Sequence, residues 1–137
     1  MPEKLSKIVI GGSRSFFNFP FFNYNLKAFL LEKFNNKNIK LVSGGAEGVD
    51  LMVKEFAKLY DIPFTEFSVT KKEWKAFGRV AGPLRNEKMV INGDYIVAFW
   101  DGKKGETKNL IDLAKRYDKP LEIIYITSDS IEEFFRR

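Results

Sequence analysis

Five short apolar segments alternate with segments of helical periodicity, and this alternation constrains the fold of the chain more than any other feature. The apolar segments are rich in β-branched and aromatic residues and cover residues 7–11, 39–43, 62–67, 94–100 and 121–126. They are apolar at most positions, as in strands of a sheet that helices cover on both faces. The sequence therefore predicts an α/β fold with a parallel five-stranded sheet in the order 3-2-1-4-5 and helices on both faces.

The intervening segments place apolar side chains on one face of a helix. Apolar residues recur every three or four positions in residues 26–34, 49–60 and 110–117. Prolines follow two of these segments just before a strand, where the residue before proline avoids the helical region. A helical crossover is expected between the third and fourth strands, and a short last helix at residues 130–137. The length of 137 residues fits one domain, which we expect to span residues 1–137.

Composition excludes several classes of site. The chain has no cysteine and no histidine, so it can form no disulfide and lacks the ligands of the usual zinc sites. Any catalysis must use carboxylates, lysine, arginine, hydroxyl groups or the backbone, and we expect neither a metal nor a cofactor. An apolar segment of transmembrane length and a signal-peptide pattern are both missing, so we expect a cytoplasmic protein with no membrane partner.

Basic residues outnumber acidic ones. The chain has 23 Lys and Arg against 18 Asp and Glu, which gives a net charge of +5 and a pI near 9.3. This balance favours an anionic partner, either a phosphorylated small molecule or nucleic acid, although a solvated lysine-rich surface would produce it too.

Glycine-rich segments follow three of the predicted strands: GGSRSF (11–16), SGGAEG (43–48) and WDGKKGET (100–107). The carboxyl ends of parallel strands meet at one edge of a sheet, which is where open α/β sheets bind ligands. Glycines let backbone amides approach a phosphate at a helix N-terminus, although one such loop alone is equally typical of a tight turn. The chain has neither G-x-G-x-x-G after the first strand nor a P-loop motif, which argues against ordinary dinucleotide oxidoreductases and P-loop nucleotide hydrolases.

A fourth segment, AGPLRNEKM (81–89), has the features of a helix start that binds an anion. Gly82 and Pro83 suit the first turn of a helix. Arg85 and Asn86 then lie in the opening turns, where the helix dipole favours anions and a guanidinium can hold a phosphate through two bonds.

Two arginines are predicted to act together. Arg14 and Arg85 both follow glycine turns at the same sheet edge, so we expect them to converge on one anion-sized site. The alternative for Arg85 is an ion pair with Asp50 or Glu87. Asp50 itself lies in the first turn of the helix after the second strand, where it could accept hydrogen bonds from ribose hydroxyls or cap that helix.

The motifs GGSRSF, SGGAEGVD, AGPLRNEKM and AFWDGKKGETKNLIDLA occur in an order and spacing that resemble the small stand-alone YpsA-like branch of the SLOG superfamily. That superfamily also contains the DNA-processing DprA proteins and the LOG phosphoribohydrolases, once called lysine decarboxylases. The resemblance covers about residues 7–124 and implies a Rossmann-like fold with a pocket for nucleotides or nucleotide-derived ligands. The binding positions that it implies are Gly12, Ser13, Arg14, Gly44, Gly45, Gly48, Asp50, Gly82, Arg85, Asn86, Asp101, Gly102 and Thr107. Four neighbours complete the candidate set: Ser43, Ala46, Pro83 and Trp100.

The chain departs from the related proteins at two positions. They usually carry glycine directly before the threonine of the fourth loop, where this chain has Glu106 before Thr107. A carboxylate beside a phosphate loop should weaken anion binding unless it points away or meets a cation. The LOG enzymes carry a catalytic glutamate three residues after that threonine, where this chain has Leu110, so the resemblance does not supply a catalytic residue.

Aromatic residues allow more than one interpretation. Residues 16–22 hold five phenylalanines that could form a lid over a ligand, stack on a base, form a dimer interface or belong to the core. Trp100, at the end of the fourth strand, could stack on a base, although a core position is more typical of such an apolar strand.

Three functions are consistent with these patterns. The first is a binding module or sensor for a nucleotide or nucleotide-derived ligand, as a monomer or a homo-oligomer, with no catalytic residue identified. The second is a nucleotide N-glycosidase or phosphoribohydrolase of the LOG type. The third is a DprA-like protein that binds single-stranded DNA, which the basic charge and the aromatic residues favour.

Overall fold

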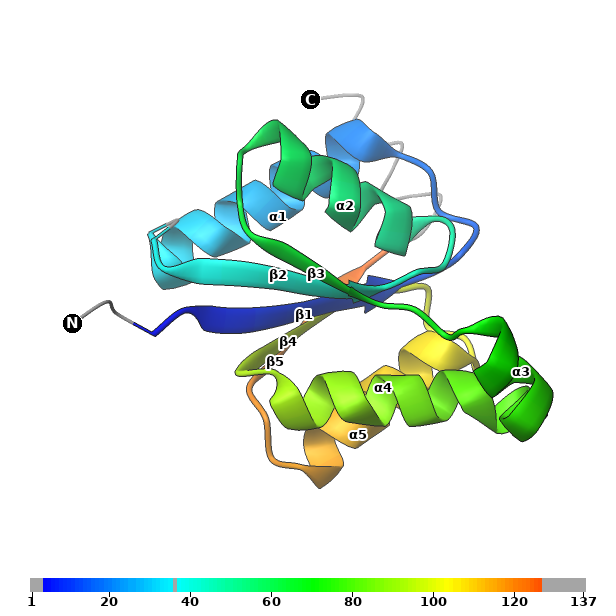
Figure 1. Ribbon diagram of the computed structural model, residues 1–137. Coiled ribbons are helices and arrows are strands. Elements are labelled where there is room, and N and C mark those ends of the chain that lie inside the picture. Colours follow the sequence, from blue (N-terminus) through cyan, green and yellow to red (C-terminus); the bar gives the residue numbers. More distant parts are fainter. Residues whose placement is uncertain (1–3, 36, 127–137) are drawn as a thin grey trace.

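The computed structural model describes residues 4–35 and 37–126, which form an α/β fold built on one parallel sheet (Figure 1). The sheet contains β1 (Ser6–Gly12), β2 (Ile39–Gly44), β3 (Phe64–Phe67), β4 (Tyr95–Trp100) and β5 (Leu121–Tyr125). The strand order is β3-β2-β1-β4-β5, and every neighbouring pair is parallel. This confirms the predicted order and places the first strand beside the fourth. The helix expected at residues 130–137 lies outside the described residues.

Helices cover both faces of the sheet, as predicted (Figure 1). Helices α1 (Phe19–Phe34) and α2 (Val49–Leu59) lie on one face, and α4 (Ala81–Asn92) and α5 (Glu106–Arg116) lie on the other. The crossover between β3 and β4 consists of α3 (Lys71–Phe77), a 3-10 turn (Gly78–Val80) and α4. Helix α3 lies beyond the carboxyl ends of the strands and packs on α4 and the 3-10 turn. None of the described helices has the length and apolar character needed to cross a membrane.

Local sequence explains where several elements begin and end. The side chain of Asn18 accepts a hydrogen bond from the backbone N–H of Phe21 at 3.1 Å and caps the start of α1. Thr70 and Glu73 form a capping box at the start of α3. The third strand begins at Phe64, two residues later than predicted, because Pro63 before it has no N–H to donate to a neighbouring strand.

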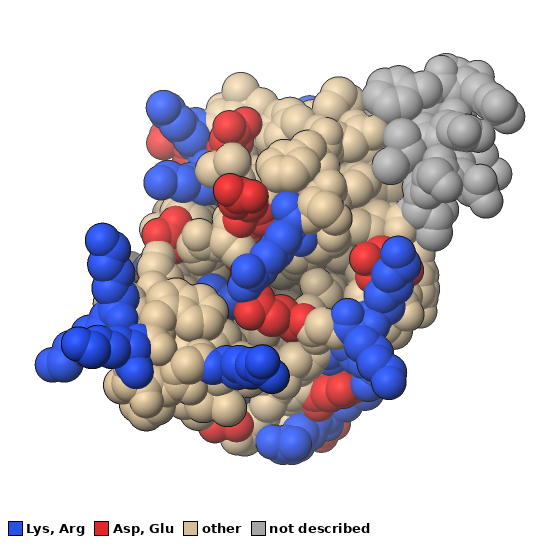
Figure 2. Space-filling model, turned by 90° about the vertical axis from the view of Figure 1, so that its right-hand side faces the viewer, with Lys and Arg blue, Asp and Glu red and all other residues tan. Residues whose placement is uncertain are grey.

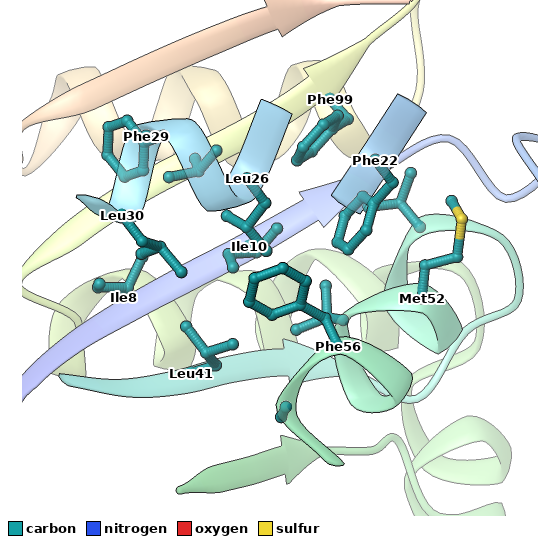
Figure 3. Packing of buried hydrophobic residues seen from close by; sticks show 14 of the residues in the cluster. Ile8, Ile10, Phe22, Leu26, Phe29, Leu30, Leu41, Met52, Phe56 and Phe99 are labelled. Carbon is teal, nitrogen blue, oxygen red and sulfur yellow. The ribbon is translucent and has the colours of Figure 1, made fainter. Parts of the chain in front are cut away.

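Side chains of each central strand alternate between two cores. Ile8 and Ile10 pack between the sheet and α1 and α2, whereas Val9 packs between the sheet and α4 and α5. Figure 3 shows the first of these cores, in which α1 and α2 contribute Phe22 and Phe56. Both faces of the strand are therefore buried, which is why its sequence is almost continuously apolar.

The phenylalanine-rich segment belongs mainly to the core. Phe16, Phe21 and Phe22 are buried, and the ring centroid of Phe22 lies 4.8 Å from that of Phe99 on β4. Phe17, in contrast, is 63% exposed. Of the interpretations that the sequence left open, a core position is therefore the correct one for three of the five rings. These rings fill the space between α1, α2 and the sheet.

Candidate functional site

The carboxyl edge of the sheet carries a cavity of about 400 Å³, formed by the loops after β1, β2 and β4 together with the first turns of α2 and α5 and the following turns of α4. The register aligns Gly12 at the end of β1 with Phe99 on β4, so the loops after these strands face each other across the cavity. Figure 2 looks onto this edge, where basic and acidic side chains lie side by side around a hollow. Nine of the candidate residues line the cavity: Gly12, Ser13, Arg14, Ala46, Asp50, Arg85, Asn86, Asp101 and Thr107.

The guanidinium groups of Arg14 and Arg85 converge in this cavity, although the two residues are 71 positions apart in the sequence. Nη2 of Arg14 lies 2.7 Å from Oε2 of Glu106, and Nη2 of Arg85 lies 3.6 Å from the same oxygen. This confirms the predicted convergence. The alternative for Arg85, an ion pair with a carboxylate, also holds, but the carboxylate is Glu106. Glu87 lies 4.0 Å from Nη1 of Arg116 instead.

Arg85 is held in place from several sides. Its side chain is only 9% exposed, its Nε donates to Oδ1 of Asn86 at 3.0 Å, and its Nη1 donates to the carbonyl oxygen of Phe67 at 3.4 Å. A Cβ atom on Gly44 would lie 2.1 Å from Nη1 of Arg85, so the guanidinium can occupy this position only because residue 44 has no side chain. One glycine of the second loop therefore serves to admit an arginine rather than to form a turn.

Asn86 connects the starts of two helices. Its Nδ2 donates to the backbone oxygen of Glu106 at 3.3 Å and lies 3.1 Å from Oδ1 of Asn109. These bonds hold the first turn of α5 against α4. The cavity wall formed by the two helices is thus tied together by a polar side chain that is almost fully buried.

Asp50 is a buried acid at the start of α2. Its Oδ1 lies 2.9 Å from Oγ of Ser43, and its Oδ2 accepts a hydrogen bond from the backbone N–H of Ala46 at 3.2 Å. Burial raises the pKa of Asp50 above its ordinary value of 3.8, and the nearby Glu106 adds to this, while the hydrogen bonds and Arg85 oppose it. The carboxylate holds the second loop and also borders the cavity.

The other candidate residues lie outside the wall of the first cavity. Ser43 and Gly44 are buried beneath it, Gly48 caps α2, and Gly45 borders a second cavity. Pro83 and Gly82 lie in the first turn of α4, and Gly102 is exposed on the loop after β4.

Trp100 neither borders the cavity nor lies fully in the core. It is half-buried, and its indole Nε1–H donates to the carbonyl oxygen of Lys103 at 2.8 Å. Its ring centroid lies 5.9 Å from that of Tyr125 on β5. Trp100 therefore stabilises the loop after β4 through its hydrogen bond to Lys103, without bordering the cavity.

Several residues border the cavity that the candidate set did not include, among them Met89, Lys103, Lys104, Glu106 and Leu110. Met89 follows Arg85 and Asn86 by four and three positions, so helical spacing could have identified it. Leu110 follows Glu106 and Thr107 in the same way. The sequence gives little reason to place Lys103 and Lys104 in a binding site, since lysines in an exposed loop usually point into solvent.

A second cavity of about 340 Å³ adjoins the first and shares Arg14, Ala46 and Arg85 with it. Trp74 of α3 borders this second cavity and is 43% exposed. The arginine pair therefore lies between two hollows, one at the strand ends and one beneath α3.

Comparison with known proteins establishes the fold. No family model matches the chain, and no curated protein matches its sequence. Among solved structures, DNA processing protein A from Helicobacter pylori, described for its single-stranded DNA binding mode, is 19% identical with a TM-score of 0.65 over 88% of this chain. DNA processing protein A (DprA) from Streptococcus pneumoniae is 14% identical with a TM-score of 0.71 over 90% of this chain.

A third similar structure is TM1055, a structural genomics target, which is 18% identical with a TM-score of 0.59. This chain spans 65% and 52% of the lengths of the two DNA processing proteins, and the match with TM1055 covers 85% of this chain and 72% of that one. The described part of the chain therefore has the Rossmann-like α/β fold of the DNA processing proteins.

Proposed function

We propose that the protein is a binding module for a nucleotide or nucleotide-derived ligand, held by the glycine-rich loops at the carboxyl edge of the sheet. The observation that carries this proposal is the convergence of Arg14 and Arg85 beside the first turns of α2 and α5. Helix N-termini and guanidinium groups both favour anions, and together they are typical of phosphate sites. On its four motifs, we also assign the chain to the YpsA-like branch.

The two arginines differ in what they can do for a ligand. The side chain of Arg14 is 55% exposed, so it can close on a phosphate. Arg85 is buried and already bonded, so it supplies a fixed positive charge. Asp50, Asp101 and Thr107 add polar groups around them that can recognise ribose hydroxyls.

We favour binding without turnover over glycosidic cleavage. Leu110, at the position where the resembled LOG enzymes carry their catalytic glutamate, is 2% exposed and borders the cavity with an apolar side chain. Glu106 is the acid nearest to the arginines, and it is engaged by both of them. Breaking a glycosidic bond needs a carboxylate positioned at the sugar.

The first experiment is a thermal-shift screen against nucleotides, followed by calorimetry with the best ligand. A ligand that binds only the folded protein raises its melting temperature. Arg14→Gln should weaken binding about tenfold, because it removes a charge-assisted hydrogen bond from an exposed position. Arg116→Gln is the matched control, since Arg116 is 68% exposed on the last turn of α5, and it should leave affinity unchanged.

Two results would count against this proposal. If no nucleotide raises the melting temperature, or if Arg14→Gln binds as tightly as the parent protein, the cavity is not the nucleotide site. Release of free base from a nucleoside monophosphate by the parent protein would instead establish the phosphoribohydrolase alternative.

Single-stranded DNA binding is a second candidate, and the surface of α3 favours it. Lys71, Lys72, Lys75 and Arg79 are exposed along α3 and the turn after it, together with the rings of Trp74 and Phe77. Exposed aromatic rings among basic side chains are typical of surfaces on which unpaired bases stack. This surface borders the second cavity, which contains the arginine pair, and a DNA processing protein of the same fold is described as binding single-stranded DNA.

Trp74→Ala tests this second candidate. If bases stack on α3, the variant should bind a labelled deoxythymidine oligonucleotide about tenfold more weakly in fluorescence anisotropy, since stacking contributes roughly 1–3 kcal/mol per base. Tyr117→Ala, which removes a 38% exposed ring at the far end of α5, should change nothing. Affinity that does not fall steeply with salt, or equal effects of the two substitutions, would exclude DNA binding at α3.

A further inference from the structure

Glu106 lies where the two arginines meet. Its Oε2 is 2.7 Å from Nη2 of Arg14 and 3.6 Å from Nη2 of Arg85. Its other oxygen lies against Gly82 in the first turn of α4, where a Cβ atom would approach it to 2.5 Å. The carboxylate therefore lies against both arginines and α4, next to any anionic group that the arginines would bind.

The surrounding structure sets this position. Glu106 is the first residue of α5, and its backbone oxygen accepts a hydrogen bond from Nδ2 of Asn86 on α4. Gly82 leaves room for the carboxylate beside α4, and the side chain is 35% exposed. Glu106 is thus a built component of the arginine site rather than a surface group that touches it by chance.

Glu106 also changes the charge that the cavity presents to a ligand. Two guanidinium groups carry two positive charges, and the carboxylate compensates one of them. With every group ionised, four basic and three acidic side chains line the cavity, for a net charge of +1, and without Glu106 it would be +2. A phosphodiester carries one negative charge, whereas a terminal phosphate carries nearly two at neutral pH because its second pKa is about 6.

We propose that Glu106 is a specificity-determining residue that makes the cavity favour a nucleotide-derived ligand with a singly charged phosphodiester over one with a doubly charged terminal phosphate. The inference rests on the proposed nucleotide binding and adds the charge of the ligand to it. A singly charged group can share the two arginines with Glu106 and balance their charge. A doubly charged group leaves one negative charge uncompensated beside Glu106, and like charges at this distance repel each other.

The test compares adenosine 5′-monophosphate with its methyl ester, which has the same base and ribose but one negative charge fewer. Calorimetry at pH 8 should show that the parent protein binds the ester at least as tightly as the monophosphate. Glu106→Gln should tighten the monophosphate on the order of tenfold more than the ester, because the lost negative charge had repelled two charges rather than one. Asp112→Asn removes the same charge from the exposed side of α5, where Asp112 pairs with Lys108, and should leave both affinities within about twofold.

A double substitution tests the charge balance directly. Arg14→Gln combined with Glu106→Gln returns the net charge of the cavity to its original value, so the ratio of the two affinities should return to that of the parent protein even if both ligands bind more weakly. Melting temperatures identify any variant that fails to fold. The ratio of the affinities for the monophosphate and its ester distinguishes selection by charge, which changes the ratio, from a loss of hydrogen bonds, which weakens both ligands alike.

The possible failures are distinguishable. If the parent protein prefers the monophosphate, or if Glu106→Gln tightens both ligands equally, Glu106 does not select ligand charge, while nucleotide binding stands. If neither the parent protein nor Glu106→Gln binds either ligand at millimolar concentration, the proposed nucleotide binding is wrong and the inference falls with it.

Discussion

Asp50 illustrates, at the scale of a single residue, how a buried acid can support a loop. The hydroxyl of Ser43 lies 2.8 Å from the carbonyl oxygen of Ile10 and 2.9 Å from Oδ1 of Asp50, and it can donate its one proton to only one of them at a time. When Ser43 donates to Asp50, the hydrogen bond stabilises the carboxylate and opposes the effect of burial on its pKa. Burial is the larger of the two effects, so the pKa of Asp50 is raised.

The raised pKa gives a prediction with a defined sign. An acid that holds its proton more tightly when folded stabilises the protein below its ordinary pKa of 3.8, and this stabilisation is lost as the pH rises through the folded-state value. At pH 7 the buried charge is a cost, so Asp50→Asn should raise the melting temperature. The amide can accept from Ala46 and donate to Ser43, so the loop keeps its hydrogen bonds.

Scanning calorimetry at several pH values between 7 and 4.5 checks this prediction. The gain from Asp50→Asn should shrink as the pH falls, because the parent protein then becomes protonated at this position. Asp112→Asn, at an exposed position on α5, serves as the control and should show little change with pH. A lower melting temperature of Asp50→Asn at pH 7 would contradict the stated role of burial.

At the scale of the element, α1 shows how a single segment combines core and surface rings. Asn18 caps the helix, and the first turn then directs Phe21 and Phe22 into the core. The ring of Phe22 contacts those of Phe56 on α2 and Phe99 on β4, at centroid distances of 6.1 and 4.8 Å. Phe22 therefore joins two helices and the sheet at one point.

Two substitutions, one in α1 and one just before it, should have very different effects on stability. Phe22→Ala should lower the free energy of unfolding by about 3–5 kcal/mol, since it leaves a cavity among fully packed rings. Phe17→Ala should change it by less than about 0.5 kcal/mol, because its side chain is 63% exposed. Urea titration measures both values. Similar losses from the two substitutions would show that the exposed ring also has a partner.

At the scale of the whole molecule, the parallel topology assembles the candidate site. The loops after β1 and β2, the start of α4 and the loop after β4 are distant in sequence, but every strand ends at the same edge of the sheet. This arrangement could be predicted, because continuously apolar strands separated by helices imply parallel pairing and right-handed crossovers. The meeting of Arg14 with Arg85 follows from it.

The partners of individual charges could not be predicted in this way. The sequence by itself determined the strand order, the two helical layers and the edge at which the glycine loops gather, since these depend on periodicity and chain connectivity. Only the tertiary structure decided that Arg85 faces Glu106 rather than Glu87, that Gly44 admits a guanidinium and that Trp100 lies outside the cavity. Such details depend on distances of a few ångströms between side chains of different elements, and these distances are set by how α4 and α5 pack together rather than by any local pattern.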